Sequence, residues 1–195
     1  MIDTHAHLYD PLFQPDIDQH IAEIQAAGVK EVWLPNCDLA SWDQLTELAN
    51  KFPHFVLPMI GLHPTYVKEN HIQELKGLEV LLKKSKVLAI GEIGLDYYWD
   101  KTFVDKQKMA FDLQIDWALQ KDLSIVVHSR ESTQDCIDII AKKQDGNLKG
   151  IFHCFSGSLH EAMQLIDLGF HLGIGGVLTF KNAELKSIVK EIDVK

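Results

Sequence analysis

The sequence contains little cysteine and no long hydrophobic run. Its 195 residues include three cysteines, Cys37, Cys136 and Cys154, and no Cys-x-x-Cys pair. This odd, widely spaced set argues against a disulfide framework or a cysteine zinc site and favours a reducing compartment, so we expect a cytoplasmic protein. No apolar segment approaches the roughly 18–20 residues of a membrane span. The first five residues, MIDTH, lack the basic and apolar regions of a secretory signal, so we expect no contact with a membrane.

Basic residues are also scarce. Lysine and arginine total 19 against 28 aspartates and glutamates, which gives a net charge of −9. Extensive passive binding of nucleic acid is therefore unfavourable, because it depends on basic side chains against phosphates. The charge leaves open an enzyme that holds one or two phosphates through metal ions.

The chain has no linker-like or low-complexity segment, and short apolar runs alternate with helical patterns. Apolar runs typical of buried parallel strands begin near Met1, Glu31, Phe55, Val87, Ser124, Gly150 and Phe170. Helical spacing is clearest in the sets Ile17-Ile21-Ile24, Met109-Leu113-Trp117 and Leu185-Ile188-Val189-Ile192. Ser158 with Glu161, and less clearly Ser41 with Gln44, have the spacing of a helix capping box.

This alternation predicts a single α/β domain with parallel strands. An open doubly wound sheet and a (β/α)8 barrel both fit, but no Gly-x-Gly-x-x-Gly follows the first strand to support a dinucleotide fold. Polar residues follow many different strands, which is typical of a barrel. A barrel needs eight units and seven are visible, so we expect residues 1–195 to form one barrel domain that is C-terminally incomplete.

Histidine is the residue type that stands out, with ten in the chain. His5 and His7 flank Ala6 at the end of the first predicted strand, where alternate side chains point to the same face. That spacing suits a pair of metal ligands, although two unrelated histidines would give the same pattern.

Three further residues follow later strands. His128 and His153 end the fifth and sixth predicted strands, and Glu92 lies at the end of the fourth. Each histidine alone is more simply a packed core residue, but together with His5 and His7 they indicate a metal site. No basic residue near Glu92 offers a partner for its carboxylate, so a metal is the better partner. A carboxylate can bridge two metal ions, and Glu92 is placed to do so.

Four residues have weaker signals. His63 in GLHP suits a ligand, a substrate contact or simple packing, and Asp96 suits either a partner for a ligand histidine or a turn cap. Arg130 is placed to bind an anion, with a salt bridge to Glu131 or Asp135 as the alternative. Ser156 lies in a Ser-Gly-Ser segment before a helix, where exposed amides can bind phosphate.

Six motifs in order resemble the TatD-type metal-dependent deoxyribonucleases of the amidohydrolase-like barrel superfamily. They are DTHAHL at 3–8, GLHP at 61–64, GEIGLDYY at 91–98, VVHSR at 126–130, HCFSGS at 153–158 and GIGGVLTFKNA at 173–183. The resemblance spans the whole chain. Nothing in the sequence matches the metal-binding aspartate that the family carries on its eighth strand.

The resemblance implies a TIM-type (β/α)8 barrel with two divalent ions, which could be Mg, Zn, Mn or Ni. It implies that His5 and His7 bind one ion, that Glu92 bridges both, and that His128 and His153 bind the second. His63 and Glu92 would be catalytic, and Arg130, Asp96 and Ser156 would contact the substrate.

We therefore expect a metal-dependent hydrolase that cleaves DNA phosphodiester bonds as an exonuclease, with DNA as substrate and no obligatory protein partner. A metal hydrolase of a small amide or ester, and an inactive metal-binding remnant, are the alternatives.

Overall fold

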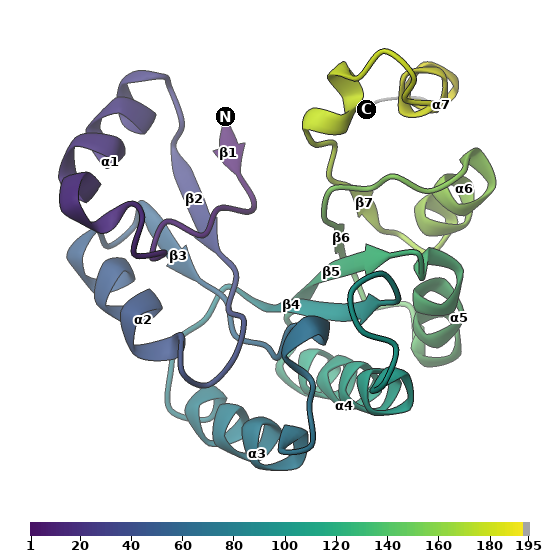
Figure 1. Cartoon of the computed structure of the whole chain (residues 1–195), viewed down its shortest axis with the longest axis horizontal. Helices are drawn as coiled ribbons and strands as arrows, with labels where there is room; N and C mark the ends of the chain where they lie inside the picture. Colours follow the sequence, from purple (N-terminus) through teal and green to yellow (C-terminus); the bar gives the residue numbers. More distant parts are fainter. Residues whose placement is uncertain (193–195) are drawn as a thin grey trace.

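The computed structural model describes residues 1–192, which form an arc of parallel strands with helices on its outer side (Figure 1). The strands are β1 (Ile2–Asp3), β2 (Glu31–Leu34), β3 (Val56–Pro58), β4 (Ala89–Asp96), β5 (Ser124–Arg130), β6 (Gly150–Phe152) and β7 (His171–Leu172). The α-helices are α1 (Ile17–Ala26), α2 (Trp42–Lys51), α3 (His71–Leu82), α4 (Val104–Lys121), α5 (Thr133–Lys143), α6 (Leu159–Asp167) and α7 (Leu185–Glu191). Three short 3₁₀ helices are η1 (Gln14–Asp16), η2 (Pro64–Tyr66) and η3 (Gly176–Thr179).

The strands pair in chain order. β1, β2 and β3 form one parallel group, β4 to β7 form another, and a bridge between Ile60 and Ile90 joins the two. Within residues 1–192, β1 and β7 each pair with one neighbour and lie at the two ends of the arc (Figure 1). Sequential parallel pairing with helices outside is the order of a (β/α) barrel, whereas a doubly wound sheet reverses its strand order. The predicted α/β barrel with seven visible units is confirmed.

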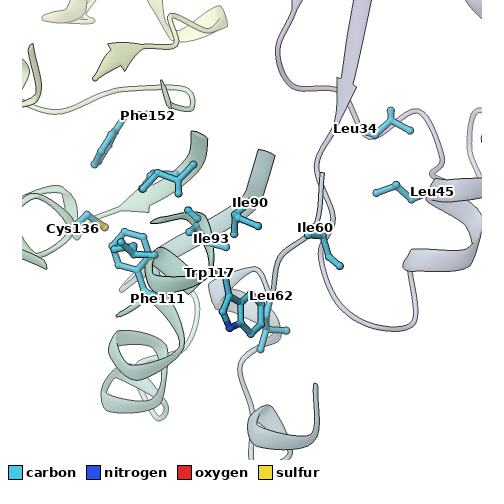
Figure 2. Close-up of a cluster of buried hydrophobic side chains, with 14 of the residues drawn as sticks. Leu34, Leu45, Ile60, Leu62, Ile90, Ile93, Phe111, Trp117, Cys136 and Phe152 are labelled. Atoms are coloured by element: carbon cyan, nitrogen blue, oxygen red, sulfur yellow. The ribbon is translucent and has the colours of Figure 1, made fainter. Parts of the chain in front are cut away.

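The main core lies between the strands and the surrounding helices. Ile90 and Ile93 of β4 belong to the same buried cluster as Phe111 and Trp117 of α4 (Figure 2). Burying one such side chain fully contributes about 1.5–3 kcal/mol, before the entropy cost of ordering it. β4 is buried along its whole length, which explains why its sequence is almost continuously apolar.

Helix α4 buries a different face from the one its apolar spacing predicts. Met109 and Leu113 are 51% and 39% exposed, and only Trp117 of that set is buried. The buried face instead includes Gln107 and Gln114. Their side chains bond to backbone groups beyond the helix, and they lie on the same face as the buried apolar residues Phe111, Ile115 and Ala118.

These two glutamines fix the ends of neighbouring strands. Oε1 of Gln114 accepts a hydrogen bond from the Leu62 amide at 2.6 Å, and its Nε2 donates to the Leu62 carbonyl at 3.3 Å. Oε1 of Gln107 accepts from the Asp96 amide at 2.9 Å. Buried backbone groups need such partners, and the segment after β3 and the last residue of β4 are thereby held against α4.

One of the two predicted capping boxes forms. Ser158 accepts from the Glu161 amide, and the Glu161 carboxylate accepts from the Ser158 amide, at the start of α6. The Ser41 interpretation is wrong, because its hydroxyl donates to the Asp38 carbonyl and bonds to Asn36 instead of capping α2. Within the part of the chain that the structure describes, no helix has the length and apolarity to cross a bilayer.

Candidate metal centre

Glu92 lies at the centre of the histidine cluster. It sits within β4, which continues to Asp96, so the prediction that Glu92 ends its strand is wrong. Gly91 pairs with Val126 and Ile93 pairs with Val127, so Glu92 is an extra residue in the register, a bulge. Bulges re-aim side chains and are frequent beside active sites. The carboxylate is 3% exposed.

Asn36, just after β2, holds this bulge. The backbone amide of Asn36 donates to the Gly91 carbonyl at 3.1 Å, and its backbone carbonyl accepts from the Glu92 amide at 3.1 Å. Asn36 is fully buried, and its side chain bonds to Gly61 and Ser41. The backbone of Asn36 therefore positions Glu92, and the side-chain bonds of Asn36 hold that backbone in place.

Four imidazoles face the Glu92 carboxylate. The ring-nitrogen to carboxylate-oxygen distances are 3.1 Å for His5, 3.8 Å for His7, 3.7 Å for His63 and 3.2 Å for His128. The donor atoms form two sets, each mutually within 4.8 Å, namely His5-His7-Glu92 and His63-Glu92-His128. Glu92 is common to both sets.

The histidines reach this point by different local routes. β1 ends at Asp3 and β3 at Pro58, so His5, His7 and His63 follow their strands rather than ending them. The Ala6 amide still donates to the Trp33 carbonyl of β2, which keeps both flanking histidines on one side. His63 precedes η2, and its Nδ1 accepts a hydrogen bond from the Thr65 amide at 3.2 Å.

His153 reaches the site in another way. It follows β6 directly, and its ring stacks on that of His5 with centroids 3.3 Å apart and planes 11° apart. The resemblance pairs His153 with His128, whereas in the described structure the imidazole grouped with His128 is His63.

Tyr9 sets the protonation of the His7 ring. Its hydroxyl donates to the Pro35 carbonyl at 2.8 Å and lies 3.0 Å from Nδ1 of His7. Because the hydroxyl has a single proton, Nδ1 of His7 must donate to it. Nε2 of His7 then carries a lone pair toward Glu92, which is the form that a metal ligand requires.

Asp96 sets the position of His128. Oδ2 of Asp96 lies 2.8 Å from Nε2 of His128, and Nδ1 of the same ring lies 3.2 Å from Glu92. Oδ1 of Asp96 accepts from the amides of Tyr98 and Trp99. Asp96 is 1% exposed, and its carboxylate contacts protein groups. It therefore lacks the exposed surface that a direct contact with substrate would need. Asp96 therefore has both of the roles that the sequence left open, as the partner of a histidine and as the cap of a turn.

Charge states in the cluster suit a cation. Burial opposes ionisation of Glu92, but hydrogen bonds from His128 and His5 outweigh it, and the pKa of Glu92 lies well below its usual value. Burial lowers the pKa of His63 and of His153 to about 4. Burial also acts to lower the pKa of His128, but hydrogen bonds and charges of Glu92 and Asp96 raise it above the usual value.

The donor set therefore fits a divalent metal. Ionised Glu92 and neutral imidazoles are the forms that bind metal ions, and a metal at His128 would replace a proton there. Nε2 of His5 faces Glu92 at 3.1 Å, while its Nδ1 is buried without a hydrogen-bond partner among residues 1–192.

Arg130 follows His128 by two residues and Ser156 follows His153 by three, and both line a hollow of about 670 Å³ whose lining includes none of the clustered histidines nor Glu92. The alternative salt bridge of Arg130 is absent from the described residues, because Lys101 pairs with Glu131 and Lys108 with Asp135. The guanidinium instead stacks on Tyr98, with Cζ 3.8 Å from the ring centroid.

Sequence reasoning missed Tyr9 and Asn36. The signal for Asn36 was a polar residue two positions after the strand EVWL, the same pattern that revealed the other site residues. Tyr9 gave no comparable signal, because its role depends on the position of its hydroxyl in the folded chain.

Comparison with known proteins identifies the family. The profile of the family described as TatD related DNase matches residues 2–195. The chain belongs to the TatD-related DNase family. Among curated TatD-like relatives, it is 35% identical over 193 residues to the uncharacterized metal-dependent hydrolase YabD of Bacillus subtilis (strain 168), covering 98% of this chain and 75% of YabD. It is 32% identical over 184 residues to the metal-dependent hydrolase YjjV of Escherichia coli (strain K12), covering 93% of this chain and 70% of YjjV.

Solved TatD structures share the fold. The crystal structure of the TatD homologue YJJV from Escherichia coli K12 superposes with a TM-score of 0.92 at 27% identity, covering 99% of this chain and 75% of that one. A TatD family hydrolase from Entamoeba histolytica gives a TM-score of 0.84 at 26% identity, covering 99% and 70%. The chain is thus a TatD-family metal-dependent hydrolase with a (β/α) barrel fold.

Proposed function

We propose that the protein cleaves phosphodiester bonds in DNA as a two-metal exonuclease. The observation that carries the proposal is the position of Glu92, whose Oε2 faces His5 and His7 and whose Oε1 faces His128. A shared carboxylate suits a pair of ions, and paired ions serve phosphodiester cleavage in many nucleases. The family description supports DNA as the substrate class.

His5, His7, Glu92, His128 and His153 would hold two divalent ions, with Mg, Zn, Mn and Ni as candidates. When bound, such ions polarise a phosphoryl oxygen and make water a stronger nucleophile near neutral pH. They would also supply positive charge to a protein whose net charge is −9.

His63 has a different role in this proposal. Its Nδ1 accepts a hydrogen bond from the Thr65 amide, so Nδ1 has no proton. The lowered pKa of His63, about 4, keeps the ring neutral, and its single proton is therefore on Nε2. Nε2 faces Glu92 as a hydrogen-bond donor, which suits contact with a phosphate oxygen or a water better than metal ligation.

Arg130 and Ser156 would bind substrate beyond the ions. They line one hollow, in which Arg130 is the basic side chain beside the acidic residues Glu131, Asp135, Glu161 and Glu184. Asp96 would act through His128, because its Oδ2 is 2.8 Å from that ring. The single incomplete barrel domain, the cytoplasmic location and the lack of an obligatory protein partner stay predictions.

The experiment is DNA hydrolysis with defined metals. Single-stranded and duplex DNA, labelled at either end, would be incubated with Mg, Mn, Zn, Ni or EDTA, alongside circular single-stranded DNA. We expect metal-dependent release of nucleotides from one end, no cleavage of the circle, and no activity in EDTA or in Glu92→Gln.

Two outcomes would contradict the proposal. Hydrolysis of cyclic amides or lactones without hydrolysis of DNA would favour the small-substrate enzyme. Bound metal without hydrolysis of either class would favour an inactive remnant.

A further inference from the structure

Two large aromatic side chains are exposed beside the metal centre. Tyr98 is 49% exposed and Trp99 is 67% exposed. Their rings meet edge to face, with centroids 5.0 Å apart and planes at 85°. The Cζ atom of Arg130 lies 3.8 Å from the Tyr98 centroid and 5.3 Å from that of Trp99. We refer to Tyr98, Trp99 and Arg130 as the aromatic–arginine stack.

The stack is held in place by the metal centre. Oδ1 of Asp96 accepts hydrogen bonds from the amides of Tyr98 at 3.0 Å and Trp99 at 2.9 Å, while Oδ2 contacts His128. The neighbouring Tyr97 amide donates to the Arg130 carbonyl at 2.9 Å. The exposed rings therefore sit on a turn that one carboxylate ties to a ligand histidine.

Packing does not explain the exposure of Trp99. An aromatic ring that serves the core is mostly buried, as Trp42 and Trp117 are at 6% and 4% exposed. Exposed aromatic rings that gather with an arginine are typical of a binding surface. Arg130 adds a cation whose acidic neighbours, Glu131 and Asp135, are paired with lysines among the described residues.

We propose that the aromatic–arginine stack binds an unpaired nucleobase next to the scissile phosphate, with the base on Trp99 and Arg130 on a backbone phosphate. This inference rests on the proposed nuclease function. Every base has a π-face, so such stacking is tolerant of sequence. A base inside a duplex is already stacked on its neighbours, so the site selects single-stranded or frayed DNA ends.

The test uses Trp99 fluorescence, since Trp99 is the most exposed of the four tryptophans. The protein would be titrated in EDTA, where no hydrolysis is expected, with a short thymidine oligonucleotide and with an abasic oligomer of equal length and charge. We expect quenching by the oligonucleotide and little by the abasic strand. Equal quenching by both, or none by either, would overturn the proposal.

Variants separate stacking from folding. Trp99→Ala should weaken oligonucleotide binding, measured by anisotropy of a labelled strand, by about 5- to 150-fold, whereas Trp99→Phe should retain most of it. Phe13→Ala, at an exposed aromatic before α1, is the matched control and should bind normally. Equal affinity of wild type and Trp99→Ala would overturn the proposal.

The outcomes distinguish this inference from the nuclease function. Base-dependent quenching without hydrolysis in any metal would support the stack and contradict the nuclease. Metal-dependent DNA hydrolysis with an unchanged KM in Trp99→Ala would support the nuclease and overturn the stack.

Discussion

Nδ1 of His7 lies 3.0 Å from the hydroxyl of Tyr9, whose own proton is donated to the Pro35 carbonyl, so the imidazole is the hydrogen-bond donor. This bond leaves the lone pair of His7 on Nε2, facing Glu92. At His63 the opposite holds, because the Thr65 amide occupies Nδ1 and leaves a proton on Nε2. Two imidazoles that face one carboxylate are thus prepared for different tasks by their second nitrogen.

Tyr9→Phe tests the first of these bonds. Without the hydroxyl, Nδ1 of His7 loses its acceptor, and we expect metal affinity to fall about 10–100-fold. Affinity would be measured by titration against a competing chelator. Tyr66 lines a second hollow together with His7 and Tyr9 but is more exposed than Tyr9, so Tyr66→Phe should leave affinity unchanged. Equal affinity of Tyr9→Phe and wild type would reject the role of Tyr9.

His63→Ala and His153→Ala should differ in metal content. If Nε2 of His63 is protonated, its loss should leave metal stoichiometry unchanged and reduce kcat, whereas His153→Ala should lower the number of ions per chain. Elemental analysis after dialysis at fixed free metal measures both. Full occupancy in His153→Ala, with loss in His63→Ala, would show that His63 is the ligand.

Asp96→Asn should be milder than Glu92→Ala. Loss of the carboxylate that faces Nε2 of His128 should cost about 10–100-fold in metal affinity or activity. Loss of the carboxylate shared by both donor sets should remove both ions and all activity. Similar small losses in the two variants, seen in metal content and turnover, would mean that Glu92 does not bridge.

Gly94→Ala tests how tightly β4 and β5 set the site. Gly94 has φ +138°, and an added Cβ would overlap the carbonyl oxygen of His128. We expect the free energy of unfolding to fall by about 3 kcal/mol or more. Gly28→Ala is the matched control, because Gly28 also has positive φ, +84°, but open space around it, and should cost about 1–2 kcal/mol. Urea unfolding measures both, and equal losses would show that the contact with His128 is not limiting.

Much of the site could be predicted from sequence because parallel strands bring their carboxyl ends to one edge. His5, His7, Glu92 and His128 meet for that reason. The strand boundaries were less predictable, since β1 and β3 end before the histidines and β4 runs past Glu92. The geometry of strand pairing decides where each strand begins and ends, and the hydrophobic pattern does not encode that geometry.

Other features depend on contacts between distant segments. The bulge at Glu92 is stabilised by Asn36, and the tautomer of His7 by Tyr9, whose hydroxyl also reaches Pro35. In α4 two apolar sets have helical spacing, and the buried one, Phe111, Ile115 and Ala118, shares its face with the two buried glutamines, whose partners lie in other elements. Apolar periodicity cannot anticipate a polar residue whose partner lies in another element.

The central claim is that Glu92 is shared by two metal ions, and anomalous diffraction from crystals soaked in Mn²⁺ tests it most directly. The account predicts two anomalous peaks, each roughly 2.0–2.2 Å from an oxygen of Glu92, one on the side of His5 and His7 and one on the side of His128. No anomalous peak at Glu92, or a single ion bound only by other residues, would contradict it.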